Sequence, residues 1–301
     1  MAEDAGQIRF YLRPPSWTQR AVLIFRRAFV TAYENNFFGL AKGVAYSGLL
    51  AFFPVLTTLA AILVQSNALS VSKMLASLIF DVVPPGTEDL VLYNFTERGQ
   101  RPVSLLIIAT LLALWAASGV MASLMQGFQV AYRIKQGRPF LKQRAMAILL
   151  VIFVAVPIVA ASGLIVFGAR TERLVFTSVG LLQEEQQLQG WVSLLGRLLR
   201  FAVALGSIVC STALLYYIGP NRPNSLRQVL PGAAVATALW WGATTCFGWY
   251  VRNIANYNVL YGSIGAVVAL LVWMYLLSVI ALYGCEYNAQ RERMQSVPIP
   301  V

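Results

Sequence analysis

Histidine is absent from the 301-residue sequence. Without an imidazole there can be no Ser-His-Asp or Cys-His catalytic group, no histidine-ligated zinc site and no imidazole base that titrates near neutral pH. Most hydrolase mechanisms are therefore excluded, and we expect that the protein is not an enzyme.

Cysteine is also scarce. The sequence has three cysteines, Cys210, Cys246 and Cys285, and each lies in a different stretch without charged residues. The sequence contains no Cys-x-x-Cys motif, so neither a disulfide framework nor a metal-thiolate site is predicted. We expect no metal and no cofactor.

Charged residues make up 12% of the sequence, against roughly 25% in an average soluble domain. They leave six charge-free gaps, each of which is at least 21 residues long. Because a helix rises 1.5 Å per residue, about 20 apolar residues are needed to cross the hydrocarbon core of a bilayer. The gaps predict an all-α, polytopic membrane protein with six transmembrane helices, at about residues 42–64, 103–132, 145–169, 198–218, 229–251 and 259–283.

The basic residues indicate the orientation of these helices. With the N-terminus in the cytoplasm, 15 of the 23 Lys and Arg residues and 5 of the 12 acidic residues lie on the inner side, so the net charge is +10 inside and +1 outside. This distribution follows the positive-inside rule and places both termini in the cytoplasm. It also explains the net charge of +11 without a nucleic-acid partner.

The predicted organisation has three parts. Residues 1–41 form a cytoplasmic N-terminal segment, residues 42–285 the six-helix transmembrane domain, and residues 286–301 a short cytoplasmic tail. The first 40 residues contain no apolar core followed by a small-residue cleavage site, so we expect the first span to be its own insertion signal.

Two amphipathic stretches lie outside the predicted spans. From Trp17 to Phe37 an apolar residue recurs at every fourth position, and from Ser70 to Val83 apolar residues follow the i, i+3, i+4, i+7 pattern. We expect the first to lie on the inner leaflet, attracted to anionic membrane lipids. The second is expected to rest on the outer leaflet or to cap the bundle.

Small residues recur at four-residue spacing in two of the spans, which permits close approach of helices in a membrane. We expect helix packing by Gly43 and Ser47 in the first span, and by Gly119, Ser123 and Gly127 in the second. The alternative is a narrow solute path along a glycine-lined groove.

Ionisable residues are nearly absent from the middle of the spans, which weakens a proton-coupled or ion-coupled mechanism. The candidate pathway or gating residues are instead Glu286 at the inner end of the sixth span, Asn256, Asn258 and Tyr261 before that span, and Pro54, which interrupts the first span.

These candidates have structural alternatives. In a transporter, Glu286 would bind or gate a cation at the inner face, and the Asn and Tyr residues would line an outer vestibule. Otherwise, Glu286 stabilises the end of the helix through Asn288 or an inner-loop arginine such as Arg222, and the Asn and Tyr residues are caps and interfacial belt residues.

Several segments resemble motifs of one bacterial family. These segments are residues 41–54 (AKGVAYSGLLAFFP), 114–119 (LWAASG), 217–221 (YIGPN), 230–233 (LPGA), 257–266 (YNVLYGSIGA), 273–276 (WMYL) and 284–289 (GCEYNA). Together, and in this order, they are similar to the YihY/BrkB family of bacterial inner-membrane proteins, with Cys285 standing where alanine is expected. The resemblance implies a six-span protein of the bacterial cytoplasmic membrane without an established activity. The family was once labelled ribonuclease BN, but this sequence, without histidine, has no evident apparatus for phosphodiester cleavage.

Three functions remain open from the sequence. The first is a transporter or permeation pathway for an unidentified solute. The second is an envelope scaffold or lipid-organising protein, with a homo-oligomer or an envelope protein as partner. The third, a membrane-embedded enzyme, would need carboxylates from the first outer loop, such as Asp81 and Glu88.

Overall fold

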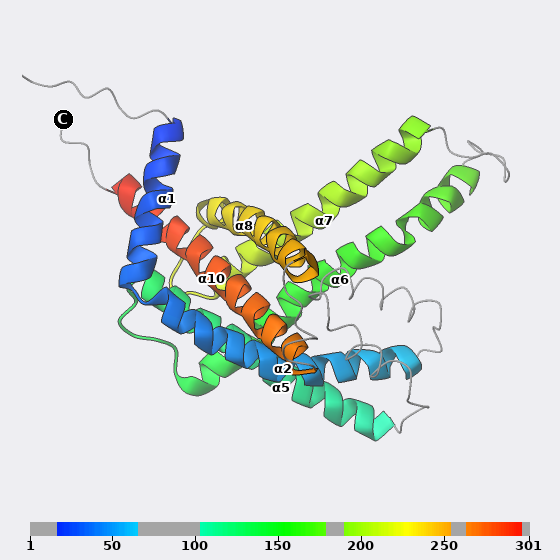
Figure 1. Ribbon diagram of the computed structural model, residues 1–301, viewed down its shortest axis with the longest axis horizontal. Coiled ribbons are helices and arrows are strands. Elements are labelled where there is room, and N and C mark those ends of the chain that lie inside the picture. Colours follow the sequence, from blue (N-terminus) through cyan, green and yellow to red (C-terminus); the bar gives the residue numbers. More distant parts are fainter. Residues whose placement is uncertain (1–16, 66–102, 179–189, 254–262, 297–301) are drawn as a thin grey trace, which may run out of the picture.

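The computed structural model describes residues 17–65, 103–178, 190–253 and 263–296, and within these ranges every regular element is an α-helix (Figure 1). In chain order they are α1 (Trp17–Glu34), α2 (Phe37–Gln65), α5 (Val103–Ala131), α6 (Phe140–Ser178), α7 (Gly190–Ile218), α8 (Leu226–Asn253) and α10 (Ser263–Ser296). The predicted amphipathic segment Ser70–Val83 lies outside the described residues.

Five helices are both long enough and apolar enough to cross a membrane. Their spanning segments are Phe37–Leu59, Leu106–Ala131, Phe140–Ala161, Leu198–Ile218 and Gly265–Gln295. The prediction of an all-α, polytopic membrane protein is confirmed. The number of spans that meet both criteria among the described residues is five, whereas six were expected.

The difference comes from α8. With 28 residues this helix is long enough to cross a bilayer. Its interior, however, carries Thr237, Thr244 and Thr245 together with the bulky pair Trp240 and Trp241, which are less hydrophobic than Leu, Ile or Val. The charge-free gap is therefore present, but the high mean hydropathy of the other spans is not.

Helix α10 occupies the centre of the arrangement. It packs against α1, α2, α5 and α8, while α2 also packs along α5 and α6 along α7. Figure 1 shows the α2–α5 pair and the α6–α7 pair as two arms that extend from the region around α10. The largest buried cluster joins α1, α2, α5, α6, α7, α8 and α10, with Phe37, Met125, Phe128, Leu150 and Tyr216 among its large side chains.

The end of α10 differs from the prediction. The sixth span was expected to end near Tyr283, but the helix continues through Glu286 to Ser296. In this extension Glu286 bonds Gln290 and Arg293 of the same helix, and Asn288 bonds the backbone of α8, so these polar side chains do not mark the end of the helix.

The predicted amphipathic helix before the first span is present as α1. A stripe of Ile24, Ala28 and Ala32 is buried, on a helix that packs against α10. Phe29 and Tyr33 on the predicted aromatic stripe are 56% and 73% exposed. Contact of these aromatic side chains with the inner leaflet therefore stays a prediction. The chain then turns at Asn36, whose φ of 54° is one that asparagine tolerates better than most residues.

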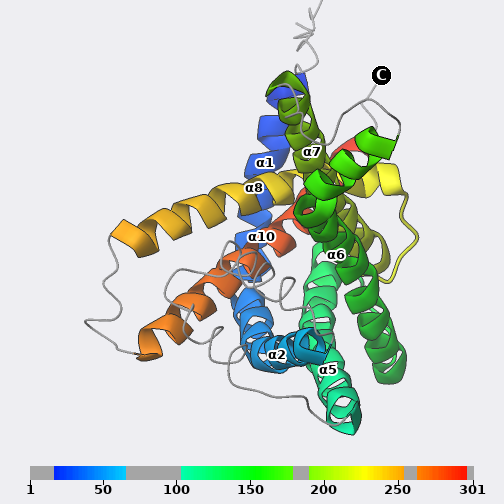
Figure 2. The same ribbon diagram turned by 90° about the vertical axis from the view of Figure 1, so that its right-hand side faces the viewer.

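Pro54 lies inside α2 and does not end it. The helix changes direction part-way along (Figures 1 and 2). A proline removes one backbone donor and its ring clashes with the carbonyl four residues earlier, which is a common cause of such bends.

Helices α8 and α10 approach so closely that their backbones touch at two glycines. A Cβ added to Gly284 would lie 2.7 Å from the Ala236 Cβ and 2.8 Å from the Gly232 carbonyl oxygen. A Cβ on Gly232 would overlap the Gly284 carbonyl oxygen. Since neither backbone can move aside easily, only glycine fits at this crossing.

Gly284→Val is therefore expected to separate α8 from α10 and to lower the free energy of unfolding by about 3 kcal/mol or more, the upper range for overpacking a core. The measurement is thermal unfolding in detergent together with the monodisperse fraction on size exclusion. Gly242→Val is the matched control, because no atom of another described helix lies within 4 Å of its added Cβ. Equal stability of the two variants would contradict the crossing.

Candidate functional site

Glu286 lies in the middle of a network of polar side chains on α10. Its carboxylate is 0% exposed. Oε1 accepts hydrogen bonds from Gln290 Nε2 at 2.8 Å and from Arg293 Nη1 at 3.1 Å. The three residues lie at i, i+4 and i+7, so they share one face of the helix. Glu286 Oε2 has no hydrogen-bond partner among the described residues.

The same network connects α10 with α1 and α5. Gln290 Nε2 also donates to Thr31 Oγ1 of α1 at 2.9 Å, and Arg293 Nη2 donates to the carbonyl oxygen of Ala131, the last residue of α5. Arg293 thus balances the buried carboxylate and caps a free carbonyl at a helix C-terminus, where a cation is favoured.

Asn288 forms a second buried connection, between α10 and α8. Its Oδ1 accepts a hydrogen bond from the Gly232 amide at 2.7 Å, and its Nδ2 donates to the Val229 carbonyl at 2.9 Å. Pro231 lies between these two residues and cannot supply a backbone donor to the helix. The Asn288 amide therefore satisfies backbone groups of α8 on either side of the proline.

Arginines hold the ends of the neighbouring helices. Arg138 donates from Nη2 and Nη1 to the carbonyl oxygens of Ile218 and Gly219, at 2.9 Å each, and so caps the C-terminus of α7. Arg222 pairs with Glu292 at 2.5 Å and lies over the Tyr132 ring at 4.3 Å. Burial lowers the pKa of the Arg138 guanidinium and raises that of the Tyr132 phenol. The phenol is therefore neutral at physiological pH.

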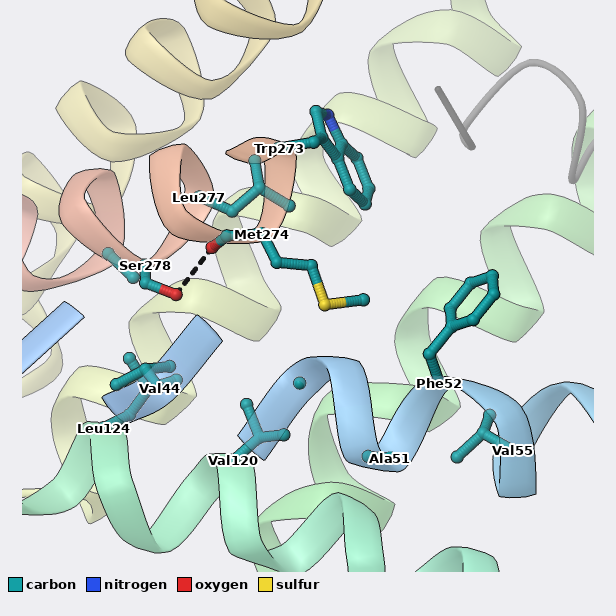
Figure 3. A pocket seen from close by; sticks show the side chains of 12 residues that line it. Val44, Ala51, Phe52, Val55, Val120, Leu124, Trp273, Met274, Leu277 and Ser278 are labelled. Carbon is teal, nitrogen blue, oxygen red and sulfur yellow. Dashed lines mark hydrogen bonds between the residues drawn. The ribbon is translucent and has the colours of Figure 1, made fainter. Parts of the chain in front are cut away.

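An apolar groove of about 370 Å³ lies between α2, α5 and α10 (Figure 3). Gly48 and Phe52 line it from α2, Val120 from α5, and Trp273 and Met274 from α10. Ser278 is a polar lining residue, but its hydroxyl donates to the Met274 carbonyl of its own helix at 2.7 Å. The groove therefore offers apolar contact and almost no hydrogen bonding.

A family model for the virulence factor BrkB matches residues 28–299 of this chain. The chain belongs to the BrkB family. A ribonuclease-like protein, YfkH, of Bacillus subtilis (strain 168) is 32% identical over 260 residues, which cover 85% of this chain and 90% of that protein.

Two further relatives of this chain are UPF0761 membrane proteins. One from Alkalilimnicola ehrlichii is 27% identical over 249 residues, which are 82% of this chain and 53% of the relative, so this chain spans about half of that relative's length. One from Alteromonas mediterranea is 27% identical over 256 residues, 85% of this chain and 83% of the relative. No solved structure matches this chain.

Three of the seven segments that carried the sequence resemblance to the BrkB family meet at this site. Residues 217–221 contain Gly219, which Arg138 caps, and residues 230–233 contain the Pro231-Gly232 break. Residues 284–289 contain Gly284, Glu286 and Asn288. Segments far apart in the sequence are thus brought together where α7, α8 and α10 pack.

The structure gives Glu286 other partners than those expected from the sequence. The sequence suggested Asn288 or Arg222, but Asn288 binds the backbone of α8 and Arg222 pairs with Glu292. Glu286 is also buried inside α10 and not placed at the end of a helix. The reason is that Gln290 and Arg293, one and two turns further on, reach its carboxylate first.

The small-residue stripes are brought together only in part. Ser47 and Ser123 meet with their Oγ atoms 3.3 Å apart, at the contact between α2 and α5. Gly127 packs against Leu282 of α10. At Gly43 no atom of the described residues lies within 4 Å of a would-be Cβ, and at Gly119 the nearest one is Arg144 Nη1 at 3.9 Å, so helix packing by these two glycines stays a prediction.

The remaining candidates lie elsewhere. Asn256, Asn258 and Tyr261 are outside the described residues. Pro54 is half-buried in α2, between Phe52 and Val55, both of which line the apolar groove. From the sequence, Asn288 was expected only as a partner of Glu286, although an internal Pro-Gly pair in a spanning helix signals backbone groups that need an outside partner.

Glu286→Gln is expected to lower the free energy of unfolding by about 1–3 kcal/mol, since Arg293 loses its charged acceptor in a buried setting. The measurement is equilibrium unfolding in detergent, in a double-mutant cycle with Arg293→Gln. We expect the combined loss to be smaller than the sum of the two single losses. Unchanged stability with altered solute flux would instead indicate gating by Glu286.

Asn288→Asp is expected to destabilise the protein by about 1–3 kcal/mol, because a second carboxylate oxygen would face the Val229 carbonyl where the amide now donates. The same unfolding measurement applies. Asn253→Asp is the matched control, since its amide bonds the Trp249 carbonyl on the exposed surface of α8. A loss of the same size in both variants would refute the bridging role of Asn288.

Proposed function

We propose that this membrane protein is a transporter or permeation pathway, and that its solute is an amphipathic, lipid-like molecule. The observation that supports this most is the apolar groove between α2, α5 and α10. Its volume of about 370 Å³ lies within the roughly 300–1,000 Å³ of ordinary small-molecule sites.

The lining of the groove favours an apolar occupant over a hydrated one. A polar solute or an ion would lose hydrogen bonds to water and gain almost none, which is costly. An acyl chain or another apolar tail loses nothing in this environment. Pro54, near the bend of α2, lies next to the groove-lining residues Phe52 and Val55, and Val55 is 41% exposed.

The alternative is an envelope scaffold or lipid-organising protein without transport. It is supported by the tight packing around Gly232 and Gly284 and by the network around Glu286, which fill the region where the helices converge. In this alternative the groove holds a lipid permanently. Saturable movement of lipid distinguishes the two, since a scaffold binds lipid but does not accelerate its transfer.

Three further expectations belong to this proposal. The excess of basic residues on one side supports a location in the bacterial inner membrane with both termini in the cytoplasm. The lack of histidine supports a function other than catalysis, ribonuclease activity included. The partners that fit are membrane lipids and, for a scaffold, another copy of the chain or an envelope protein.

Ala51→Leu is expected to fill the groove and to slow transfer of a fluorescent phospholipid across proteoliposome membranes by about tenfold, the effect of a few methyl groups in a fitted site. Met274→Ala is expected to leave transfer equal or faster, because it enlarges the groove. The measurement is the fraction of lipid fluorescence that a membrane-impermeant reductant quenches with time.

Leu50→Phe is the control, since Leu50 precedes Ala51 but is 56% exposed and does not line the groove. Size exclusion and a melting curve show whether each variant is folded. Transfer that equals that of protein-free liposomes for the unmodified chain would remove the transporter proposal and leave the scaffold.

A further inference from the structure

Arg144 has a position that its place in the sequence does not suggest. The sequence assigns it to the inner loop before the third span, but α6 begins at Phe140, so Arg144 belongs to the helix and to the spanning segment Phe140–Ala161. Its side chain extends along α5, where Nη2 donates to the Trp115 carbonyl oxygen at 2.9 Å. Its guanidinium carbon lies 4.0 Å from the centre of the Trp115 ring.

Trp115 lies far from both ends of α5. It is 9 residues after Leu106 and 16 residues before Ala131, the two ends of the spanning segment. At 1.5 Å per residue, these separations are about 14 Å and about 24 Å. Measured along α5, the Arg144 guanidinium therefore lies beside the interior of the spanning segment, although the Arg144 Cα is four residues from Phe140, the first residue of its own span. Arginines near helix ends usually extend toward the interface.

The guanidinium has unused hydrogen-bonding capacity. An arginine side chain carries five N–H donors. One bond, to the Trp115 carbonyl, is made by Nη2, while Nε is buried without a partner among the described residues. The ion pairs within the described part of the chain are Arg222 with Glu292 and Arg293 with Glu286, so no carboxylate there balances the charge of Arg144.

The surface beside this guanidinium is apolar and open. Trp115 is 56% exposed, and Leu112 and Ile108, three and seven residues earlier on the same face of α5, are 60% and 53% exposed. This face differs from the one that lines the groove of Figure 3. Gly119, four residues after Trp115, shares the Trp115 face, whereas the groove-lining residue Val120 lies about 100° further around the helix. A half-buried cation, with its Nε atom buried, thus lies at one end of an exposed apolar strip.

We propose that Arg144 and Trp115 bind the phosphate of an anionic phospholipid, with the acyl chains along Leu112 and Ile108. A guanidinium presents parallel N–H groups that match two phosphate oxygens, and this charge-assisted pairing is strongest away from water. The indole holds the guanidinium flat and in place. In the membrane the molecule that combines a phosphate with apolar chains is a phospholipid, which favours it over free phosphate.

This site specifies the class of headgroup that the proposed transporter would bind. Binding of the lipid does not depend on the proposed function, whereas movement of the bound lipid does. A phosphate held inside the apolar zone is an intermediate position for a headgroup that crosses the membrane along α5. Equilibrium binding tests the site without transport, so failure of the site and failure of transport are separate results.

The experiment measures binding of spin-labelled phosphatidylglycerol and phosphatidylcholine to the full chain in phosphatidylcholine nanodiscs. The unmodified chain is expected to prefer the anionic lipid, and Arg144→Gln to lower that preference by about tenfold, as expected for loss of one charge-assisted pair. Arg144→Lys, which retains the charge but not the paired donors, is expected to retain part of the preference.

Lys142→Gln is the matched control, since it removes one exposed positive charge two residues earlier on α6. It is expected to leave the preference unchanged. An equal loss in Lys142→Gln and Arg144→Gln, or an unchanged preference in folded Arg144→Gln, would overturn the site. Displacement of the anionic lipid by millimolar inorganic phosphate would overturn the assignment to a lipid headgroup.

Discussion

The contact between the backbones of α8 and α10 at Gly232 and Gly284 is the constraint on which the rest of the structure depends. Helices in a membrane gain little from the hydrophobic effect, so they associate through close packing and hydrogen bonds. Because these two glycines have no side chain, the helix backbones come into contact. At this distance the short Asn288 side chain reaches both the Gly232 amide and the Val229 carbonyl, on either side of Pro231. From there, α10 also reaches α1 through Gln290 and α5 through Arg293. One crossing thus sets the position of the central helix for all its neighbours.

The charge-free gaps predict the helices well, because a charged side chain is costly at any position of a membrane span. They predict the start of α5 at Val103 and the end of α7 at Ile218 to the residue. They place the end of the last span near Tyr283, whereas helix α10 continues past Glu286, because a carboxylate that bonds Gln290 and Arg293 does not require water. The prediction is also incomplete for α8, whose aromatic and threonine content lowers the mean hydropathy although the length is sufficient.

The candidate site was predicted less well than the fold for a related reason. Four-residue spacing shows which residues share a helix face but not which helix they meet. Ser47 and Ser123 do meet, whereas Gly127 faces α10 and Gly43 faces open space. The role of Asn288 depends on a partner 56 residues earlier, and no local pattern encodes that distance. Bonding partners far apart in sequence become visible only when the packing is known.

The position of a residue in the sequence does not show where its charge lies when the side chain is long. Arg144 was counted with the inner loop because its Cα lies near the beginning of α6, yet its guanidinium lies beside Trp115 in the interior of the α5 span. From the sequence, ionisable residues are nearly absent from the middle of the spans, which counted against a charged solute. This is true of the positions of the Cα atoms, but the guanidinium of Arg144 reaches further along α5 than its Cα. A cation at that depth has few stable arrangements: a carboxylate, a backbone carbonyl or an anionic ligand. Since one carbonyl satisfies only one of the five donors of Arg144, the geometry leaves room for a ligand with several oxygens.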